Sequence, residues 1–237
     1  MIKLHWDFNY RRLEEWKNRR LKSKKIKNLK KYKAVLFDMD GVIVDSMPYH
    51  FISWFETLKK YKVTVSPFDI YENEGEKCEI CVKRFFKRDN IKCDDKIIEQ
   101  VLKLRDKLYK KYFKVHLFPD IEQVLNRLKK QGFLLAIVTG SNREKVKSML
   151  PKKIVSKFDI IVAADMIKRG KPHPDSYLAA AKQLNVKPGE CIVIENAPYG
   201  IKAAKAAKMF CVAVTTSLPE QYLKQANIVC KKVSEIL

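Results

Sequence analysis

The sequence has 237 residues, of which 46% are hydrophobic, and a formal net charge of +22. This length suits one large domain or a core with a small insert, and no apolar run approaches the roughly 18 residues that a membrane-spanning helix needs. The first residues show neither the apolar segment nor the cleavage site of a secretory signal. We therefore expect a cytoplasmic protein without a membrane span.

A basic extension, residues 1–32, opens the chain. Residues 1–33 contain 13 Lys and Arg but only three acidic residues, and a few apolar residues are interspersed among them. This pattern predicts a basic helix. We expect a solvated Lys-rich helix, because the whole chain is rich in lysine. The alternative is an arm that binds nucleic acid or an anionic membrane surface.

The next segment predicts a buried strand that ends in two aspartates. The apolar residues 34–37 run directly into Asp38 and Asp40, and Gly41 then allows a sharp turn. A short apolar run without polar alternation is typical of a strand buried on both faces of a parallel sheet. Ligands of such sheets bind beyond the carboxyl ends of the strands. A calcium loop can also begin Asp-x-Asp-Gly, but its next ligand positions hold Val42, Val44 and Ser46.

Residues 47–115 predict a helical insertion. Apolar residues recur at helical spacing through this stretch, and apart from residues 63–66 none of it resembles a buried strand. The stretch contains Cys78 and Cys81, whose spacing also occurs in metal and redox sites. Because no second ligand pair stands at a matching spacing, we expect two small apolar residues that face a core. All six cysteines are expected to be free thiols.

From residue 116 onward, apolar strands and amphipathic helices alternate with short connections. Strands are expected within residues 133–141, 158–165, 191–196, 210–216 and 227–232, and helices within 121–132, 141–150, 174–185, 198–208 and 219–226. This alternation predicts an α/β fold, a Rossmann-like doubly wound parallel sheet that also includes the first strand. The core would then comprise residues 33–46 and 116–237, with residues 47–115 inserted as a small helical cap.

Polar residues follow three further strands of this expected sheet. They are Thr139, Gly140 and Ser141, then Lys171, then Glu195 and Asn196. Because the carboxyl ends of parallel strands meet at one edge, we expect these residues to converge with Asp38 and Asp40.

In this order and on this topology, the motifs resemble those of the haloacid dehalogenase superfamily of phosphotransferases. The resemblance covers residues 33–237 and all four family motifs. The segments that carry it are Asp38-Met39-Asp40-Gly41-Val42, Thr139 or Ser141 in VTGS, Lys171 in KPHP, and Glu195-Asn196 in IENAPYGIKAA. The insertion between the first two motifs resembles the helical-cap branch, which contains beta-phosphoglucomutase and many sugar-phosphate phosphatases.

The resemblance implies a catalytic role for each motif. Asp38 would attack phosphorus and form an aspartyl phosphate. Asp40 would protonate the leaving alkoxide and then accept a proton from the attacking water, a role that a true dehalogenase does not need. Lys171 would offset the negative charge of the site. The phosphoryl oxygens would be held by Thr139, Gly140 and Ser141, and His50 would contact the substrate.

The resemblance also implies a Mg²⁺ ion. Its oxygen ligands would come from Asp38, from the backbone carbonyl of Asp40, and from Glu195 and Asn196. Family members commonly carry a second carboxylate where this chain has Asn196. An amide oxygen can bind Mg²⁺ but adds no negative charge, so either Glu195 or Asn196 could be the direct ligand.

We therefore expect a Mg²⁺-dependent phosphatase, a phosphoric monoester hydrolase whose substrate is a small phosphorylated metabolite, a sugar or polyol phosphate. A beta-phosphoglucomutase-like mutase is the alternative enzyme. The simplest alignment puts Cys78 where the mutase has a phosphate-binding arginine, and Glu74 and Glu76 would oppose a second phosphate. Lys77 or Arg84 would have to hold that phosphate in a mutase. The alternative of another class is a nucleic-acid-binding module that uses residues 1–32.

Overall fold

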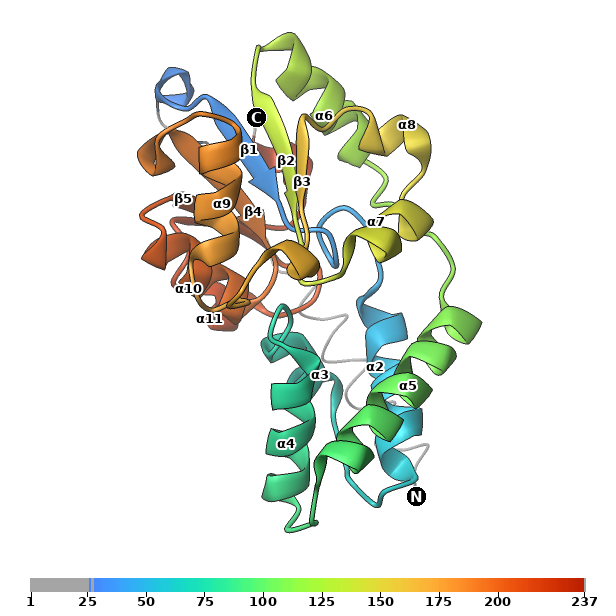
Figure 1. Cartoon of the computed structure of the whole chain (residues 1–237). Coiled ribbons are helices and arrows are strands. Elements are labelled where there is room, and N and C mark those ends of the chain that lie inside the picture. Colours follow the sequence, from blue (N-terminus) through green and yellow to red (C-terminus); the bar gives the residue numbers. More distant parts are fainter. Residues whose placement is uncertain (1–25, 27, 237) are drawn as a thin grey trace.

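A single parallel sheet organises the chain. The computed structural model describes residues 26 and 28–236 (Figure 1). The six strands lie in the order β3-β2-β1-β4-β5-β6. They are β1 (Ala34–Phe37), β2 (Leu134–Val138), β3 (Ile160–Val162), β4 (Cys191–Glu195), β5 (Phe210–Val214) and β6 (Ile228–Cys230). The first strand along the chain occupies the middle, since β1 pairs in parallel with β2 on one side and with β4 on the other.

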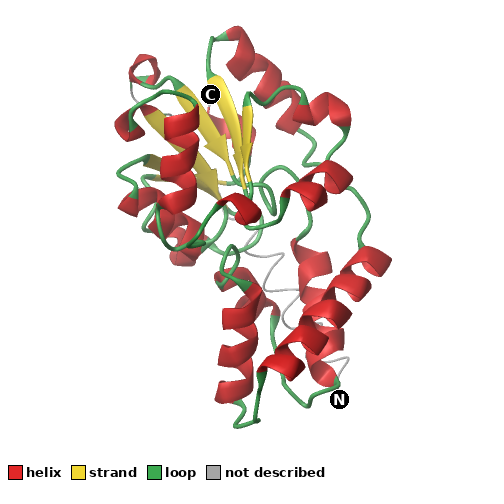
Figure 2. Ribbon diagram, in the orientation of Figure 1, coloured by secondary structure: helices red, strands yellow, loops and turns green. Residues whose placement is uncertain are grey.

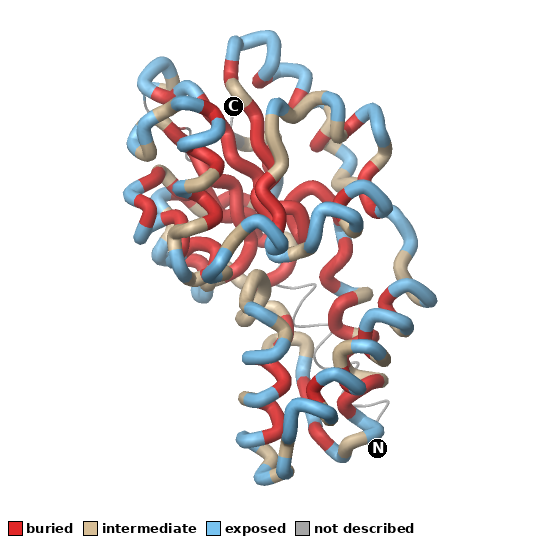
Figure 3. The backbone as a smooth tube through the Cα atoms, viewed as in Figure 1, coloured by how far each residue is buried: buried red, intermediate tan, exposed pale blue. Residues whose placement is uncertain are grey.

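Helices cover both faces of the sheet (Figure 2). Side chains of β1 alternate between the two faces: Val35 and Phe37 pack toward one helical layer, and Ala34 and Leu36 toward the other. The first layer contains α6 (Ile121–Lys130), α7 (Arg143–Met149), α8 (Lys152–Val155) and the 3-10 helix η4 (Val233–Ile236), and the second contains α9 (Asp175–Gln183), α10 (Pro198–Ala206) and α11 (Glu220–Leu223). Burial on both faces explains why the strand sequence is continuously apolar, and the central strands β1 and β4 are buried at every residue (Figure 3).

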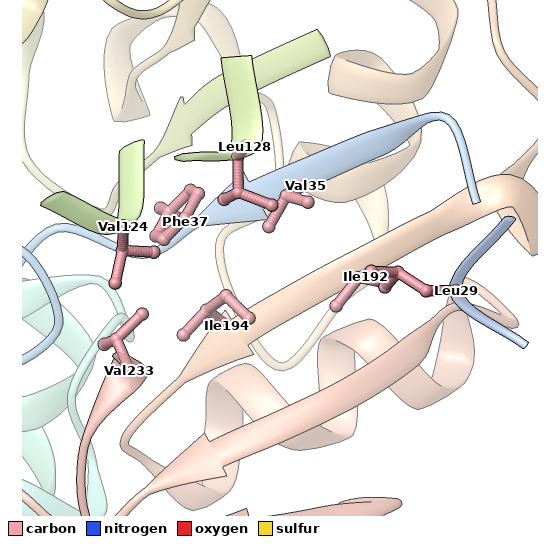
Figure 4. Close-up of a pocket in the computed structure, with 8 residues that line it drawn as sticks. All are labelled: Leu29, Val35, Phe37, Val124, Leu128, Ile192, Ile194 and Val233. Atoms are coloured by element: carbon pink, nitrogen blue, oxygen red, sulfur yellow. The ribbon is translucent and has the colours of Figure 1, made fainter. Parts of the chain in front are cut away.

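The layer under α6 contains a small cavity of about 10 Å³. Figure 4 shows the apolar side chains around it: Leu29, Val35, Phe37, Val124, Leu128, Ile192, Ile194 and Val233. Among the described residues, no polar side chain lines it, so it is a gap in core packing without a side-chain hydrogen-bonding group for a ligand or water.

Four helices between β1 and β2 form a separate helical unit. They are α2 (Met47–Lys59), α3 (Pro67–Glu72), α4 (Cys78–Arg88) and α5 (Asp95–Tyr112). The unit has its own apolar cluster, in which Trp54 and Phe85 meet edge to face with ring centroids 6.1 Å apart. Side-chain caps fix two helix starts, since Ser66 forms a capping box with Asp69, and Asp94 accepts the backbone N–H of Ile97.

The helical unit lies beyond the carboxyl ends of the strands (Figure 1). Two connecting segments join it to the sheet, and they run side by side. The backbone N–H of Asp45 donates to His116, and that of Phe118 donates to Ile43. The unit is therefore inserted after β1 without interrupting the sheet.

The predicted α/β class and the order of strands and helices are confirmed, with differences at the short helices. The helix α8 was not expected, and α11 spans only Glu220–Leu223 of the predicted 219–226. The described cysteines are all free, as predicted, and Cys191, Cys211 and Cys230 are buried. Among the described residues, no helix is long and apolar enough to cross a membrane.

Nearly all of residues 1–32, where a basic helix was predicted, lie outside the described residues. Near the end of this range, Leu29–Lys31 form a 3-10 turn, η1. The role of the extension therefore stays a prediction.

Candidate active site

The carboxyl edge of the sheet brings the predicted residues together. Asp38 and Asp40 follow β1, Thr139 follows β2, Lys171 lies in the segment after β3, and Glu195 ends β4. None of these five residues is more than 4% exposed. Charged groups this deeply buried need partners of opposite charge, and the site supplies them.

Lys171 links two carboxylates. Its Nζ lies 2.5 Å from Oδ1 of Asp38 and 2.6 Å from Oε1 of Glu195. Tyr177 also donates its hydroxyl to Oε1 of Glu195 at 2.9 Å. Burial lowers the pKa of Lys171, but the two carboxylates outweigh it, so the pKa lies above its ordinary value. The ammonium group therefore stays charged and can neutralise anions in the site.

Asp38 is buried against the same lysine. Burial raises the pKa of the Asp38 carboxyl, the charge of Lys171 opposes this shift, and the charge of Glu195 adds to it. Its second oxygen, Oδ2, is buried and has no hydrogen-bond partner among the described residues. One oxygen of the carboxyl is thus held in place by Lys171, while the other is left to interact with a ligand.

Glu195 and Asn196 differ in what their oxygens do. Oε2 of Glu195 accepts the backbone N–H groups of Asn196 at 2.8 Å and of Ala197 at 3.1 Å, so both oxygens of Glu195 have donors. Nδ2 of Asn196 donates to Ser217 at 2.8 Å, which orients the amide, and its Oδ1 is buried without a partner in the described part of the chain.

Two buried oxygens without donors, Oδ2 of Asp38 and Oδ1 of Asn196, fit the donor set of a hard divalent cation. The turn that follows Asp40 requires glycine, because Gly41 has φ +81° and a Cβ there would lie 2.1 Å from Nδ2 of Asn196. The side-chain oxygens of Asp40 already accept hydrogen bonds, so its backbone carbonyl is the group left for the metal-binding role that the family resemblance implies.

Asp40 is held by three side chains. Ser46 donates its hydroxyl to Oδ1 at 2.6 Å, Nε2 of His50 lies 3.1 Å from the same oxygen, and Ser141 donates to Oδ2 at 3.4 Å. Burial raises the pKa of Asp40, but His50, Lys145 and Ser46 outweigh it, so the pKa lies below its ordinary range. His50, which was predicted to contact the substrate, therefore contacts the carboxyl group of the second aspartate, Asp40.

The loop after β2 is braced from within. The Thr139 hydroxyl accepts the backbone N–H of Ser141 at 3.0 Å. A Cβ on Gly140 would lie 3.2 Å from Cα of Gly75, so a loop of the helical unit passes directly over this turn. The residues predicted to hold phosphoryl oxygens therefore lie beneath the helical unit.

A cavity of about 410 Å³ separates the sheet edge from the helical unit. Both sides line it, and the lining includes Gly140, Ser141 and Lys145 from the sheet side and Trp54, Glu74 and Arg105 from the helical unit. A larger hollow of about 680 Å³ lies near β5 and β6 and contains none of the predicted site residues. The first cavity is therefore the candidate substrate site.

Sequence reasoning missed several residues of the site. Ser46 hydrogen-bonds to Asp40, Tyr177 hydrogen-bonds to the predicted metal ligand Glu195, and Ser217 orients Asn196. Glu74, which was expected to oppose a second phosphate, lines the cavity. Tyr177 follows the apolar spacing of its helix and so looked like a core residue. Ser46 directly precedes the insertion that resembles the helical-cap branch, and this position was a usable signal.

Comparison with known proteins adds a family. The family model described as haloacid dehalogenase-like hydrolase matches residues 35–214. Protein SUPPRESSOR OF QUENCHING 1, chloroplastic, of Arabidopsis thaliana is 36% identical over 205 residues, which is 83% of this chain and 19% of that protein, so the chain spans about a fifth of this relative.

Two shorter relatives match over most of their length. Beta-phosphoglucomutase of Bacillus subtilis is 31% identical, covering 86% of this chain and 91% of its own, and Hexitol phosphatase A of Escherichia coli is 28% identical, covering 86% and 93%. A crystal structure of beta-phosphoglucomutase from Clostridium difficile superposes with a TM-score of 0.76 at 29% identity, covering 87% of this chain and 93% of that one.

Proposed function

Because the chain belongs to the haloacid dehalogenase-like hydrolase family, we propose that it is a Mg²⁺-dependent phosphatase of a small phosphorylated sugar or polyol. The observation that carries the proposal is the buried cluster in which Lys171 bridges Asp38 and Glu195 while Oδ2 of Asp38 has no partner among the described residues. The relatives named as a hexitol phosphatase and a phosphoglucomutase support a phosphatase-type enzyme.

Asp38 is the proposed nucleophile. A carboxylate oxygen attacks phosphorus, the bond from phosphorus to the ester oxygen breaks, and an aspartyl phosphate forms. The Asp38 carboxylate and the phosphoryl group are both negatively charged and repel each other, and Lys171 offsets this repulsion. The backbone N–H groups near Gly140 and the Ser141 hydroxyl bind phosphoryl oxygens. Burial strengthens these interactions because water does not screen them.

Asp40 is the proposed acid and base. It gives a proton to the leaving ester oxygen, and it then takes one from the water that attacks the aspartyl phosphate. Contacts from Ser46 and His50 hold its carboxyl at one orientation, which fixes the group that exchanges the proton with the reacting oxygen.

Mg²⁺ is the proposed ion, held by Oδ2 of Asp38, Oδ1 of Asn196 and the backbone carbonyl of Asp40. When bound, it offsets phosphoryl charge. Asn196 is preferred over Glu195 as the direct ligand because both oxygens of Glu195 already have donors. The helical unit, residues 47–115, would act as a cap that keeps bulk water from the core of residues 33–46 and 116–237.

The test is a screen of phosphorylated sugars and polyols with Mg²⁺ that measures both free phosphate and isomerised sugar phosphate. The proposal expects net phosphate release that EDTA abolishes and Mg²⁺ restores, and that Asp38→Asn lacks. Efficient isomerisation with negligible free phosphate would establish the mutase instead. Phosphate release unaffected by EDTA would contradict the metal assignment.

A further inference from the structure

Glu74 comes from the helical unit, yet its carboxyl lies beside the second aspartate of the sheet edge. Ligand atoms of Glu74, Asp40 and His50 all lie within 4.8 Å of one another. Asp40 is the group expected to touch the ester oxygen that leaves. Glu74 therefore faces the organic part of a substrate, next to the bond that breaks.

The loop that carries Glu74 is fixed by close backbone contacts. Gly75 has φ +87°, and a Cβ there would lie 2.6 Å from Cδ of Lys171. A Cβ on Gly140 would lie 3.2 Å from Cα of Gly75, and a Cβ on Gly170 would lie 3.3 Å from the carbonyl oxygen of Gly75. Three glycines thus let the loop rest on two core loops, which sets the position of Glu74.

The Glu74 carboxyl has acceptor capacity to spare. It lines the 410 Å³ cavity, and no hydrogen bond or ion pair to it is found within the described part of the chain. Its neighbour Glu76, by contrast, pairs with Arg84. Burial raises the pKa of Glu74, and the charge of Asp40 adds to this while His50 and Lys145 oppose it. A carboxylate accepts hydrogen bonds only, so its partner must be a donor.

The distance to Asp40 defines which donor fits. Two hydrogen bonds of about 2.7 Å, one to the leaving oxygen and one to a hydroxyl on the next carbon, span a gap of this size. A carboxylate or second phosphate at that carbon would instead meet a like charge in a poorly screened site. The position thus favours a neutral hydroxyl and opposes an anion.

From this geometry we propose that Glu74 determines specificity by selecting esters with a hydroxyl on the carbon next to the phosphoester carbon and rejecting those with a carboxylate there. The inference rests on the proposed phosphatase function. It names the substrate class more narrowly, as phosphates of vicinal diols and polyols, and assigns the choice to a residue outside the motifs.

The test compares kcat/KM for propane-1,2-diol 1-phosphate and propyl phosphate, which differ by one hydroxyl, and for 2-phosphoglycolate, which carries a carboxylate. Wild type should prefer the diol phosphate over propyl phosphate by about 10- to 100-fold, the effect of one hydrogen bond to a charged acceptor. Glu74→Ala should lose this preference because its kcat/KM falls for the diol phosphate and stays unchanged for propyl phosphate. Glu74→Gln should raise the relative rate on 2-phosphoglycolate.

Glu72→Ala is the matched control, because Glu72 is a carboxylate of the same helical unit, at the end of α3, and is not among the residues that line the cavity. It should keep the wild-type preference. Turnover of p-nitrophenyl phosphate reports whether each variant is folded and active. If wild type and both Glu74 variants hydrolyse the esters with the same preference, the inference is wrong while the proposed function stands. If wild type releases phosphate from no ester, the proposed function itself fails.

Discussion

Glu195 and Asn196, neighbours at the end of β4, are proposed to have different roles because their oxygens have different partners. Glu195 is surrounded by donors from Lys171, Tyr177 and the backbone, whereas Oδ1 of Asn196 has none among the described residues. A fully hydrogen-bonded carboxylate orients Lys171, and an unpartnered oxygen can bind a cation.

This difference predicts the effect of charge at residue 196. Asn196→Asp adds a negative oxygen ligand where Oδ1 now lies, so the Mg²⁺ concentration for half-maximal activity should fall by about tenfold. The measurement is a Mg²⁺ titration of phosphate release at fixed substrate. An unchanged midpoint would place Asn196 outside the direct ligands of the ion.

Asp40 gives a second prediction, which depends on the leaving group. Asp40→Asn should slow hydrolysis of an alkyl phosphate by about 10²- to 10⁴-fold, since the alkoxide needs a proton to leave. The first step with p-nitrophenyl phosphate should suffer less, because its leaving group is already stable as an anion. Burst kinetics on both esters measure this, and equal losses would argue against Asp40 as the acid.

The predicted catalytic residues could be found from sequence because each stands directly after a buried strand or in a family motif. Asp38, Asp40 and Lys171 satisfy this, and the structure brings them to one edge as expected. The resemblance placed Glu74 beside a second phosphate, but its proximity to Asp40 could not be found in this way. Its position depends on contacts between Gly75 and core loops far away in sequence, which no local pattern encodes.

At the scale of elements, the loop between α3 and α4 connects the helical unit to Lys171. Gly75→Ala should lower kcat by about tenfold or more, because the added Cβ strains a left-handed residue and displaces a lysine held by two carboxylates. Gly132→Ala is the control, since Gly132 also has φ +83° but open space around it. It should cost about 1 kcal/mol of stability and leave kcat unchanged.

Thermal unfolding and steady-state kinetics of both variants decide this point. Equal kcat losses, or a loss for Gly75→Ala that only follows unfolding, would show that the contact with Lys171 does not matter for turnover.

Elements with a clear apolar pattern were predictable from sequence and the short helix α8 was not, for a physical reason. Strands buried on both faces have continuous apolar runs, and α6 and α9 show clear helical periodicity, so their order follows from sequence. The four-residue α8 is too short for a periodic pattern and forms after Pro151 by packing Ile154 into the core. Three of the site's polar partners, Tyr177, Ser217 and Glu74, likewise depend on tertiary contacts.

At the scale of the whole molecule, burial should protect the core thiols. It raises the pKa of Cys191 and Cys230 to about 12, so at pH 8 both remain protonated and unreactive. Alkylation of the native protein followed by peptide mass spectrometry should label half-buried Cys93 well before these two, and denaturant should make all three reactive. Rapid native labelling of Cys191 or Cys230 would contradict the packing described.

The chain also combines a net charge of +22 with a buried anionic reaction centre. A positive field would draw phosphate esters toward the molecule, and in the proposed mechanism Lys171 neutralises the attacking and attacked anions. That mechanism depends on one residue more than on any other: Asp38, whose carboxylate is the proposed nucleophile.

The most direct test of that claim is the turnover of Asp38→Asn on the best ester from the screen, with circular dichroism to show an intact fold. An amide is a poor nucleophile, so phosphate release should fall on the order of 10⁴-fold or more below wild type. A rate within tenfold of wild type would show that phosphoryl transfer does not pass through Asp38.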